Sequence, residues 1–136
     1  MYTFRKSERL CNRVTIGKLY SSPKRELVFP LSAHWMYTDP QQDKKAAKVQ
    51  VIITAPKKKL HHAVDRNHAK RIIRECYRLR KHRLYEALAG KTSDTSQTPT
   101  MAISINYIYD KIADFHRIEA AMDKLIDKLT EDIAHD

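Results

Sequence analysis

The chain has 136 residues, of which 42% are hydrophobic, so we expect one folded domain over residues 1–136 and exclude a disordered chain. It carries 26 Lys and Arg residues against 16 Asp and Glu, a formal net charge of +10, which favours an anionic partner. The sequence shows neither an apolar run long enough to cross a bilayer nor a signal peptide, so we expect a cytoplasmic protein in which Cys11 and Cys76 stay reduced.

The first predicted element is a helix from Glu8 to Tyr20. Ser7 can cap it, and Leu10 and Val14, with Ile16 or Leu19, face inward. Gly17 lowers the helix propensity within it by about 1 kcal/mol. The turn residues Ser21-Ser22-Pro23 end it.

Two strands are predicted next. The first covers Leu27–Tyr37, where apolar residues alternate and Pro30 places the early part at a sheet edge. A hairpin-type loop, Thr38–Asp43, leads to a second strand over Lys48–Ala55, which Pro56 ends. The residues expected on the inner face of the first strand are Leu27, Phe29, Leu31, Ala33, Trp35 and Tyr37.

The segment from Lys57 to Arg83 carries most of the excess charge. It holds eleven bases and only two acids, Asp65 and Glu75, so its local charge is +9 of the +10 for the whole chain. Such a segment repels itself unless an anion lies against it, which makes a polyanion the natural partner. The bases are Lys57, Lys58, Lys59, Arg66, Lys70, Arg71, Arg74, Arg78, Arg80, Lys81 and Arg83.

Within this segment a long helix with two opposite faces is predicted. Asp65 or Asn67 can cap its start, and Gly90 can stop it after Leu88 or Ala89. At about 100° per residue, five bases share an arc of roughly 100° and five apolar residues an arc of roughly 120°. The basic arc contains Lys70, Arg71, Arg74, Arg78 and Lys81, and the apolar arc contains Ala69, Ile72, Ile73, Cys76 and Leu79.

The C-terminal third predicts a polar loop over residues 91–100, a strand over Met101–Tyr109 and an amphipathic helix. That helix repeats apolar residues from Phe115 to Leu129, and its acids are expected on the outer face, away from any polyanion. These acids are Asp123, Asp127, Glu131 and Asp132. The order of elements predicts an α+β fold, a two-layer sandwich of the form α-β-β(-β)-α-β-α.

The residues for protein-based catalysis do not gather in the sequence. His61 and His62 are adjacent rather than spaced as metal ligands, the acids do not cluster, and two glycines cannot build a phosphate-binding loop. We therefore predict no catalytic residue, no metal site and no cofactor bound by the protein alone. Two binding classes remain: an RNA-binding protein of the ribosomal, structural type, or a DNA-binding protein, which fits less well because the bases lack interleaved Asn, Gln or Ser.

Ten residues, Arg66 to Glu75, carry a more specific signal. The run RNHAKRIIRE resembles the RN-x-x-KR-x-x-RE signature of the bacterial ribonuclease P protein component, with Lys58-Lys59 at the family's spacing before it. The start Phe4–Leu10 is also similar to these proteins. His61 stands where a Gly is usual, and His68 where a third base often follows Arg-Asn.

The resemblance implies a left-handed crossover through the basic helix and a role as the protein subunit of ribonuclease P. It implies two RNA partners, the catalytic RNA and precursor tRNA, and no obligate protein partner is evident. The catalytic centre and its magnesium ions would then belong to the RNA, while the protein helps to remove the tRNA 5′ leader. The RNA-binding residues so implied are Lys57, Lys58, Lys59, Arg66, Asn67, His68, Lys70, Arg71, Arg74, Arg78 and Lys81.

By the same resemblance, the 5′ leader would lie in a cleft between the sheet and the basic helix. Tyr20 keeps a position where the family places an aromatic residue, and Ile16 replaces another. Tyr20 and His34 are therefore candidates for the leader site, whereas Trp35 and Phe29 are expected in the core.

Overall fold

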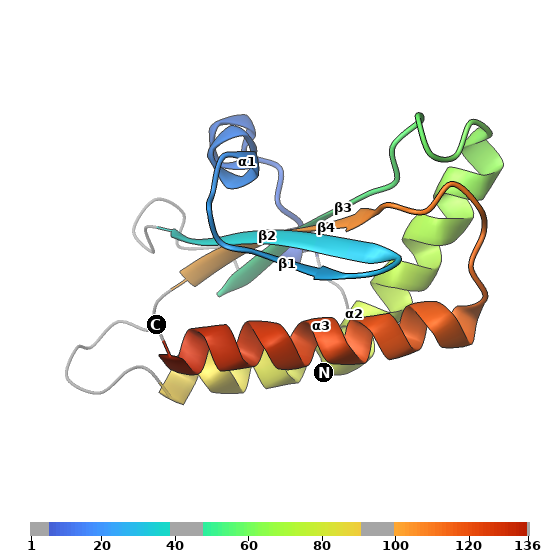
Figure 1. Cartoon of the computed structure of the whole chain (residues 1–136). Coiled ribbons are helices and arrows are strands. Elements are labelled where there is room, and N and C mark those ends of the chain that lie inside the picture. Colours follow the sequence, from blue (N-terminus) through green and yellow to red (C-terminus); the bar gives the residue numbers. More distant parts are fainter. Residues whose placement is uncertain (1–5, 39–47, 91–99, 136) are drawn as a thin grey trace.

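A computed structural model describes residues 6–38, 48–90 and 100–135 (Figure 1). Most of the predicted loop after Thr38 and nearly all of the predicted loop 91–100 lie outside these ranges. The elements in chain order are a short 3-10 helix η1 (Lys6–Glu8), α1 (Arg13–Tyr20), β1 (Arg25–Val28), β2 (Leu31–Thr38), β3 (Val49–Thr54), α2 (Ala63–Gly90), β4 (Thr100–Tyr107) and α3 (Phe115–His135).

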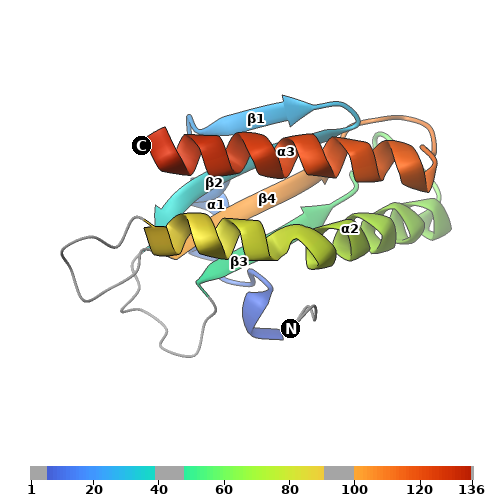
Figure 2. The same ribbon diagram turned by 90° about the horizontal axis from the view of Figure 1, so that it is seen from below.

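The four strands form one mixed sheet in the order β1-β2-β4-β3, with β3 and β4 parallel and the other pairs antiparallel. The helices α2 and α3 lie side by side on one face of the sheet, and α1 lies on the other (Figures 1 and 2). This confirms the predicted α+β order α-β-β-β-α-β-α.

The connection from β3 to β4 through α2 is left-handed. Figure 2 views the sheet from the helix side: both strands run from left to right behind α2, and β4 lies above β3. Crossovers between parallel strands are nearly always right-handed, so the element pattern alone favoured the other hand. The family resemblance gave the correct one.

The main core fills the space between the sheet and the two long helices. Alternate residues of the strands point into it, including Trp35 and Ile103, and α2 contributes Ile73 and Tyr77. Period-two alternation on the strands and a three- to four-residue period on the helices place these side chains together. This layer of packed side chains fixes α2 against the sheet.

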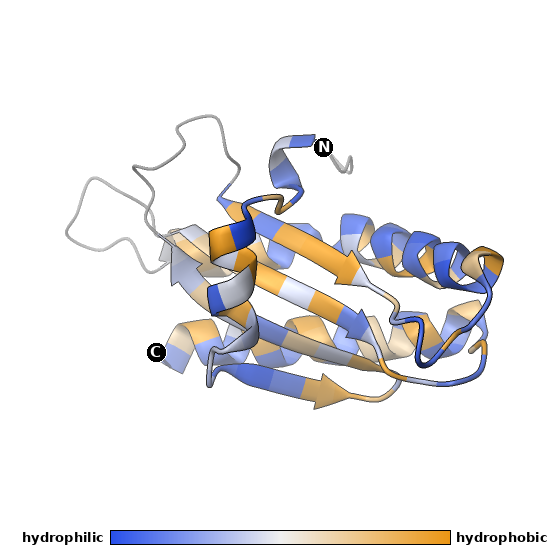
Figure 3. Cartoon of the chain, turned by 90° about the horizontal axis from the view of Figure 1, so that it is seen from above, coloured by the Kyte–Doolittle hydropathy of each residue, from blue (hydrophilic) through white to orange (hydrophobic). Residues whose placement is uncertain are grey.

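A second, smaller cluster lies on the opposite face of the sheet, under α1. Leu10, Leu19 and Ala102 are buried there, and Ile16 packs against them. Figure 3 shows α1 crossing the strands on this face of the sheet.

The predicted first helix is too long. The chain forms η1, then α1 begins at Arg13, where the side chain of Asn12 rather than Ser7 accepts from the backbone N–H groups of Val14 and Thr15. Val14 is 66% exposed, so its predicted inward position is wrong, whereas Leu10 and Leu19 are buried.

The predicted strand Leu27–Tyr37 is in fact a hairpin, because the chain turns at the cis peptide bond between Phe29 and Pro30. Val28 pairs with Leu31, so the inward positions change from even-numbered residues on β1 to odd-numbered residues on β2. The apolar residues continue to alternate at odd positions through Leu27 and Phe29, so the sequence pattern does not reveal this change. Leu27 and Phe29 are exposed, so their predicted core positions are wrong; Leu31, Ala33 and Trp35 are buried as predicted.

The basic helix α2 begins at Ala63, before either predicted cap, and its last residue is Gly90. Of its predicted apolar arc, Ala69, Ile73 and Cys76 are buried, Ile72 packs partly exposed against the core, and Leu79 is exposed. Within the described part of the chain, no helix has the length and apolarity to cross a bilayer.

Candidate nucleic-acid interface

The three lysines Lys57, Lys58 and Lys59 lie exposed on a turn that leads into α2. The carbonyl oxygen of Pro56 accepts from the backbone N–H groups of Lys59 and Leu60, which closes the turn. Leu60 is only 4% exposed and anchors the turn in the main core. The lysine side chains are therefore held at the entrance to the helix.

Arg66 holds this turn against α2. Its Nη1 donates to the carbonyl oxygens of Leu60 and His61 at 2.9 and 2.8 Å. Both bonds use the same nitrogen, so part of the guanidinium group stays available for an anion. Arg66 therefore stabilises the turn before α2, a structural role that the sequence did not indicate, and it can still make the predicted phosphate contact.

The first half of α2 carries basic side chains without acidic partners. Among the residues that the structure describes, no acidic group lies within ion-pair distance of Lys70, Arg71 or Arg74. Asn67 and His68 are exposed beside them. We call this set the basic surface; it comprises Lys57, Lys58, Lys59, Asn67, His68, Lys70, Arg71 and Arg74.

Arg78 differs from the residues of the basic surface, although the sequence placed it in the same arc. It forms an ion pair with Glu75, one turn earlier on the helix. The hydrogen bond from Arg78 lowers the pKa of the Glu75 carboxyl group, which therefore stays ionised. An anion would have to compete with Glu75 for this guanidinium group.

Lys81 differs from the other predicted RNA-binding residues because its side chain is largely buried. It is only 7% exposed, and its Nζ donates to Oε1 of Glu8 at 2.5 Å. Tyr85 donates to the same carboxylate oxygen at 3.1 Å. Lys81 joins η1 to α2, and this ion pair leaves little of its side chain exposed for the predicted contact with RNA.

The remaining bases of α2 face the C-terminal helix. Arg80 pairs with Glu119 and Asp123, and Arg83 pairs with Asp123 and Asp127. Asp123 is half-exposed and Asp127 is exposed, as predicted for the outer face, but both side chains also reach across to α2. The sequence offered no local signal for these pairs, whose partners lie about 40 residues apart.

A second polar group lies on the face of the sheet that carries α1. Asn106 is 8% exposed, and its Oδ1 accepts from the hydroxyl groups of Tyr20 at 3.2 Å and Thr54 at 2.6 Å. Its Nδ2 donates to Oγ of Ser104 at 3.3 Å. The ring of His34 lies edge-on to that of Tyr20, with centroids 5.7 Å apart. We call these five residues the Asn106 cluster.

The predicted leader cleft needs a correction in position. The space between the sheet and α2 is filled by the main core, so it cannot receive a ligand. Tyr20 and His34 do lie together, as two candidates for one site should, but on the opposite face of the sheet. His34 Nδ1 is buried and has no hydrogen-bond partner among the described residues.

Sequence reasoning missed Thr54, Ser104 and Asn106. A signal existed: Ser104 and Asn106 interrupt an otherwise apolar strand at alternate positions, so both point to one face. Two polar side chains on a central strand are costly to bury without a partner, and such a pair indicates a polar site.

No three His, Cys, Asp or Glu side chains lie together as metal ligands anywhere in residues 6–38, 48–90 and 100–135. Cys76 is buried, and burial raises the pKa of its thiol to about 11, so it serves as a core residue. The family resemblance places the magnesium ions in the RNA, and the described residues offer no cluster that would hold one in the protein.

The left-handed crossover, the helix with its basic surface and the polar sheet face define a class of small, basic α+β proteins suited to a polyanion. Residues 4–130 match the protein family ribonuclease P. The chain belongs to the ribonuclease P protein family.

Individual relatives agree with this assignment. The ribonuclease P protein component of Porphyromonas gingivalis is 30% identical over 128 residues, covering 94% of this chain and 87% of that protein. The one from Desulfatibacillum aliphaticivorans is 26% identical over 85% of this chain and 97% of its own length. The solved structure of the Staphylococcus aureus RNase P protein superposes with a TM-score of 0.63 over 90% of this chain and 95% of that one, at 17% identity, which supports the fold.

Membership of this family makes the chain a component of ribonuclease P, a ribonucleoprotein endoribonuclease of tRNA processing, and a partner of the ribonuclease P RNA.

Proposed function

We propose that the protein binds the ribonuclease P RNA through the basic surface and the 5′ leader of precursor tRNA at the Asn106 cluster. In this proposal the RNA, with its magnesium ions, carries out the cleavage, and the protein positions RNA and substrate. The observation that carries it is the set of cations on the first half of α2 and the turn before it, none of which has an acidic partner in the described chain.

The two halves of α2 differ in whether their cations have acidic partners, and this difference supports binding of the catalytic RNA at the basic surface. Cations in the second half of the helix are neutralised by acids of α3 and η1, so those side chains maintain the fold. Cations in the first half repel one another until an external anion lies against them. Backbone phosphates, which recur at regular intervals, match such a row of charges.

The Asn106 cluster suits a single strand of RNA better than a duplex. Tyr20 is 43% exposed and offers a ring on which an unpaired base can stack. Asn106 is buried beneath the ring and accepts from the Tyr20 hydroxyl group, which holds the ring in place on this face. The exposed bases Arg13 and Lys18 on α1 add charge for the phosphates of the same strand.

Reconstitution tests the proposal. Precursor tRNA with magnesium and the protein alone should remain intact, and adding ribonuclease P RNA should release the leader with higher efficiency than the RNA achieves without protein. Cleavage by RNA-free protein that persists through repurification would contradict the division of roles. A protein that leaves the RNA reaction unchanged would contradict the binding proposal.

The two sites can be separated in the same assay. Arg74→Ala should weaken assembly with the catalytic RNA, whereas Tyr20→Ala should leave assembly intact and raise the Michaelis constant only for substrates with a leader. Equal loss for leaderless and leader-bearing substrates would remove the Asn106 cluster from the substrate site.

A further inference from the structure

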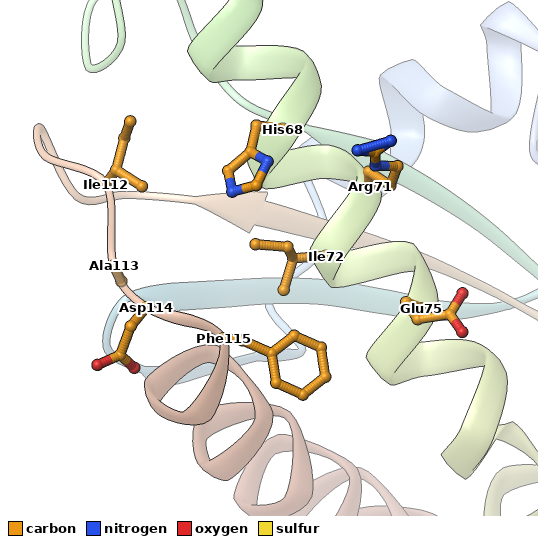
Figure 4. A pocket seen from close by; sticks show the side chains of 8 residues that line it. All are labelled: His68, Arg71, Ile72, Glu75, Ile112, Ala113, Asp114 and Phe115. Carbon is orange, nitrogen blue, oxygen red and sulfur yellow. The ribbon is translucent and has the colours of Figure 1, made fainter.

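A pocket opens between the first half of α2 and the loop that leads into α3. It has a volume of about 630 Å³ and is lined by His68, Arg71, Ile72, Glu75, Ile112, Ala113, Asp114 and Phe115. Figure 4 shows Ile72 and Phe115 pointing toward one another from α2 and α3, with His68 beside them. Its size lies within the range of pockets that take small organic groups.

The floor of this pocket is apolar and accessible. Ile112 is 52% exposed and Phe115 is 39% exposed, although both are large hydrophobic side chains. Leaving them in water forgoes the free energy of burial, and a contiguous exposed patch of this kind marks an interaction site. Neither residue takes part in the basic surface or the Asn106 cluster.

The charged residues at the rim of the pocket and its apolar floor limit which chemical groups can bind there. Arg71 and His68 belong both to the pocket and to the basic surface, so an RNA bound by its phosphates there would pass directly over the opening. A phosphate would not enter, because the floor is apolar and the rim includes the ionised carboxylate of Glu75. A nucleobase is flat and uncharged, so it suits the apolar floor, and it is attached to the RNA backbone that would pass over the opening.

We propose that this pocket receives one unpaired nucleobase of the ribonuclease P RNA, stacked on the ring of Phe115 against Ile72. The proposal rests on the proposed function of the basic surface and names a second kind of contact beside it. Phosphates give affinity without sequence information, and an inserted base fixes the register of the RNA along α2. Stacking tolerates any base, so the pocket selects an unpaired nucleotide and not a particular sequence.

Fluorescence gives the first test. The chain has one tryptophan, Trp35, which is 2% exposed and lies in the core. In Phe115→Trp the introduced indole lies in the pocket, so adding ribonuclease P RNA should quench its emission, while the emission of the parent protein should change little. An introduced indole that stays unquenched at saturating RNA would overturn the proposal.

Affinity and its salt dependence give the second. Phe115→Ala should weaken binding of the RNA by roughly 5- to 150-fold, the range for losing one base–aromatic stack, with the salt slope unchanged. Arg74→Ala should reduce the slope, because it removes a phosphate contact. Leu27→Ala removes a more exposed apolar side chain on β1, outside the pocket, and should bind as the parent does. Melting curves of each variant exclude unfolding as the cause.

The outcomes separate this inference from the proposed function. A parent protein that does not bind the RNA contradicts the proposed function itself. Normal binding by both the parent and Phe115→Ala contradicts only the base pocket. If the emission of the Phe115→Trp variant changes with protein concentration in the absence of RNA, the pocket belongs to a second copy of the chain and the proposal is overturned.

Discussion

Arg74 and Ile73 are neighbours in the sequence with opposite surroundings. Ile73 is fully buried in the main core, and Arg74 lies on the basic surface. Ile73→Ala should lower the free energy of unfolding by about 2–5 kcal/mol because it leaves a cavity. Arg74→Ala should keep the melting temperature and weaken RNA binding by about 1–3 kcal/mol, the range for a hydrogen bond to a charged group.

Thermal melting and RNA titration of both variants check this pair. Parent-like RNA binding by Arg74→Ala would show that α2 presents a different face to the RNA. A fully stable Ile73→Ala would contradict the position of the core.

Replacing Lys81 should lower stability and leave RNA binding unchanged, the opposite of what we expect for Arg74. Its side chain is 9% exposed and that of Glu8 is 6% exposed, so removing one partner leaves a buried charge. Lys81→Met should therefore lower the free energy of unfolding by about 3–5 kcal/mol. Binding of the RNA by the folded variant should match the parent.

The double variant Glu8→Leu with Lys81→Met serves as the control for that measurement. It removes both charges and should recover part of the stability lost in Lys81→Met. If Lys81→Met instead melted like the parent and bound RNA weakly, Lys81 would belong to the RNA interface.

The same residue shows what a sequence pattern can decide. Helical periodicity placed Lys81 within the basic arc, together with Lys70 and Arg74. The partner that buries it is Glu8, 73 positions earlier, and no local period reports such a distant contact. Lys70, Arg71 and Arg74 have no acidic partner in the described chain, so for these residues the local pattern and the structure agree on an unpaired charge.

At the scale of elements, the pairing of α2 with α3 depends on acids that the sequence placed on the outside. The hydrogen bond from Arg80 lowers the pKa of the Asp123 carboxyl group, and the nearby charges of Arg80 and Arg83 act in the same direction. The stabilisation is thus present above the unfolded-state pKa of about 3.9 and is lost as the pH falls through the lower, folded-state value.

We expect this loss to appear in melting temperatures measured from about pH 5 down to about pH 2. The parent should lose more stability over this interval than Asp123→Asn, which lacks the titrating group. The difference should be modest because the Asp123 side chain is 49% exposed and solvent screens the pair. Identical pH profiles for the two proteins would contradict the contribution of this pair to stability.

The boundaries of elements were less predictable than their order. Hydrophobic periodicity found the three main strands and the two long helices, because each buries one side against the same core. It could not find the β1–β2 hairpin, since apolar residues continue at odd positions through Leu27 and Phe29, although the inward positions on β1 are the even ones. Pro30, which cannot donate to a strand partner, was the available signal for a break.

At the scale of the whole molecule, the basic surface should make RNA binding strongly dependent on salt. Contact with about six phosphates would give a slope of log affinity against log salt near −4 to −5. Arg71→Ala should reduce the magnitude of this slope by about 0.7–0.9, the contribution of one phosphate, whereas Lys81→Met should leave it unchanged. Titrations at four or five salt concentrations measure it, and a flat dependence would exclude a phosphate interface.

The position of β4 has a consequence for synthesis of the chain. This strand comes late in the sequence, yet it is the only neighbour of β3 in the described sheet and joins β3 to β2. While the ribosome is still adding residues before Tyr107, β3 has no strand to pair with and α2 has only part of a sheet to cover. The cationic helix is therefore translated before the strand that fixes it in place. The sheet can be completed only after β4 has been made, so the folding rate depends on contacts between distant residues rather than on helix formation.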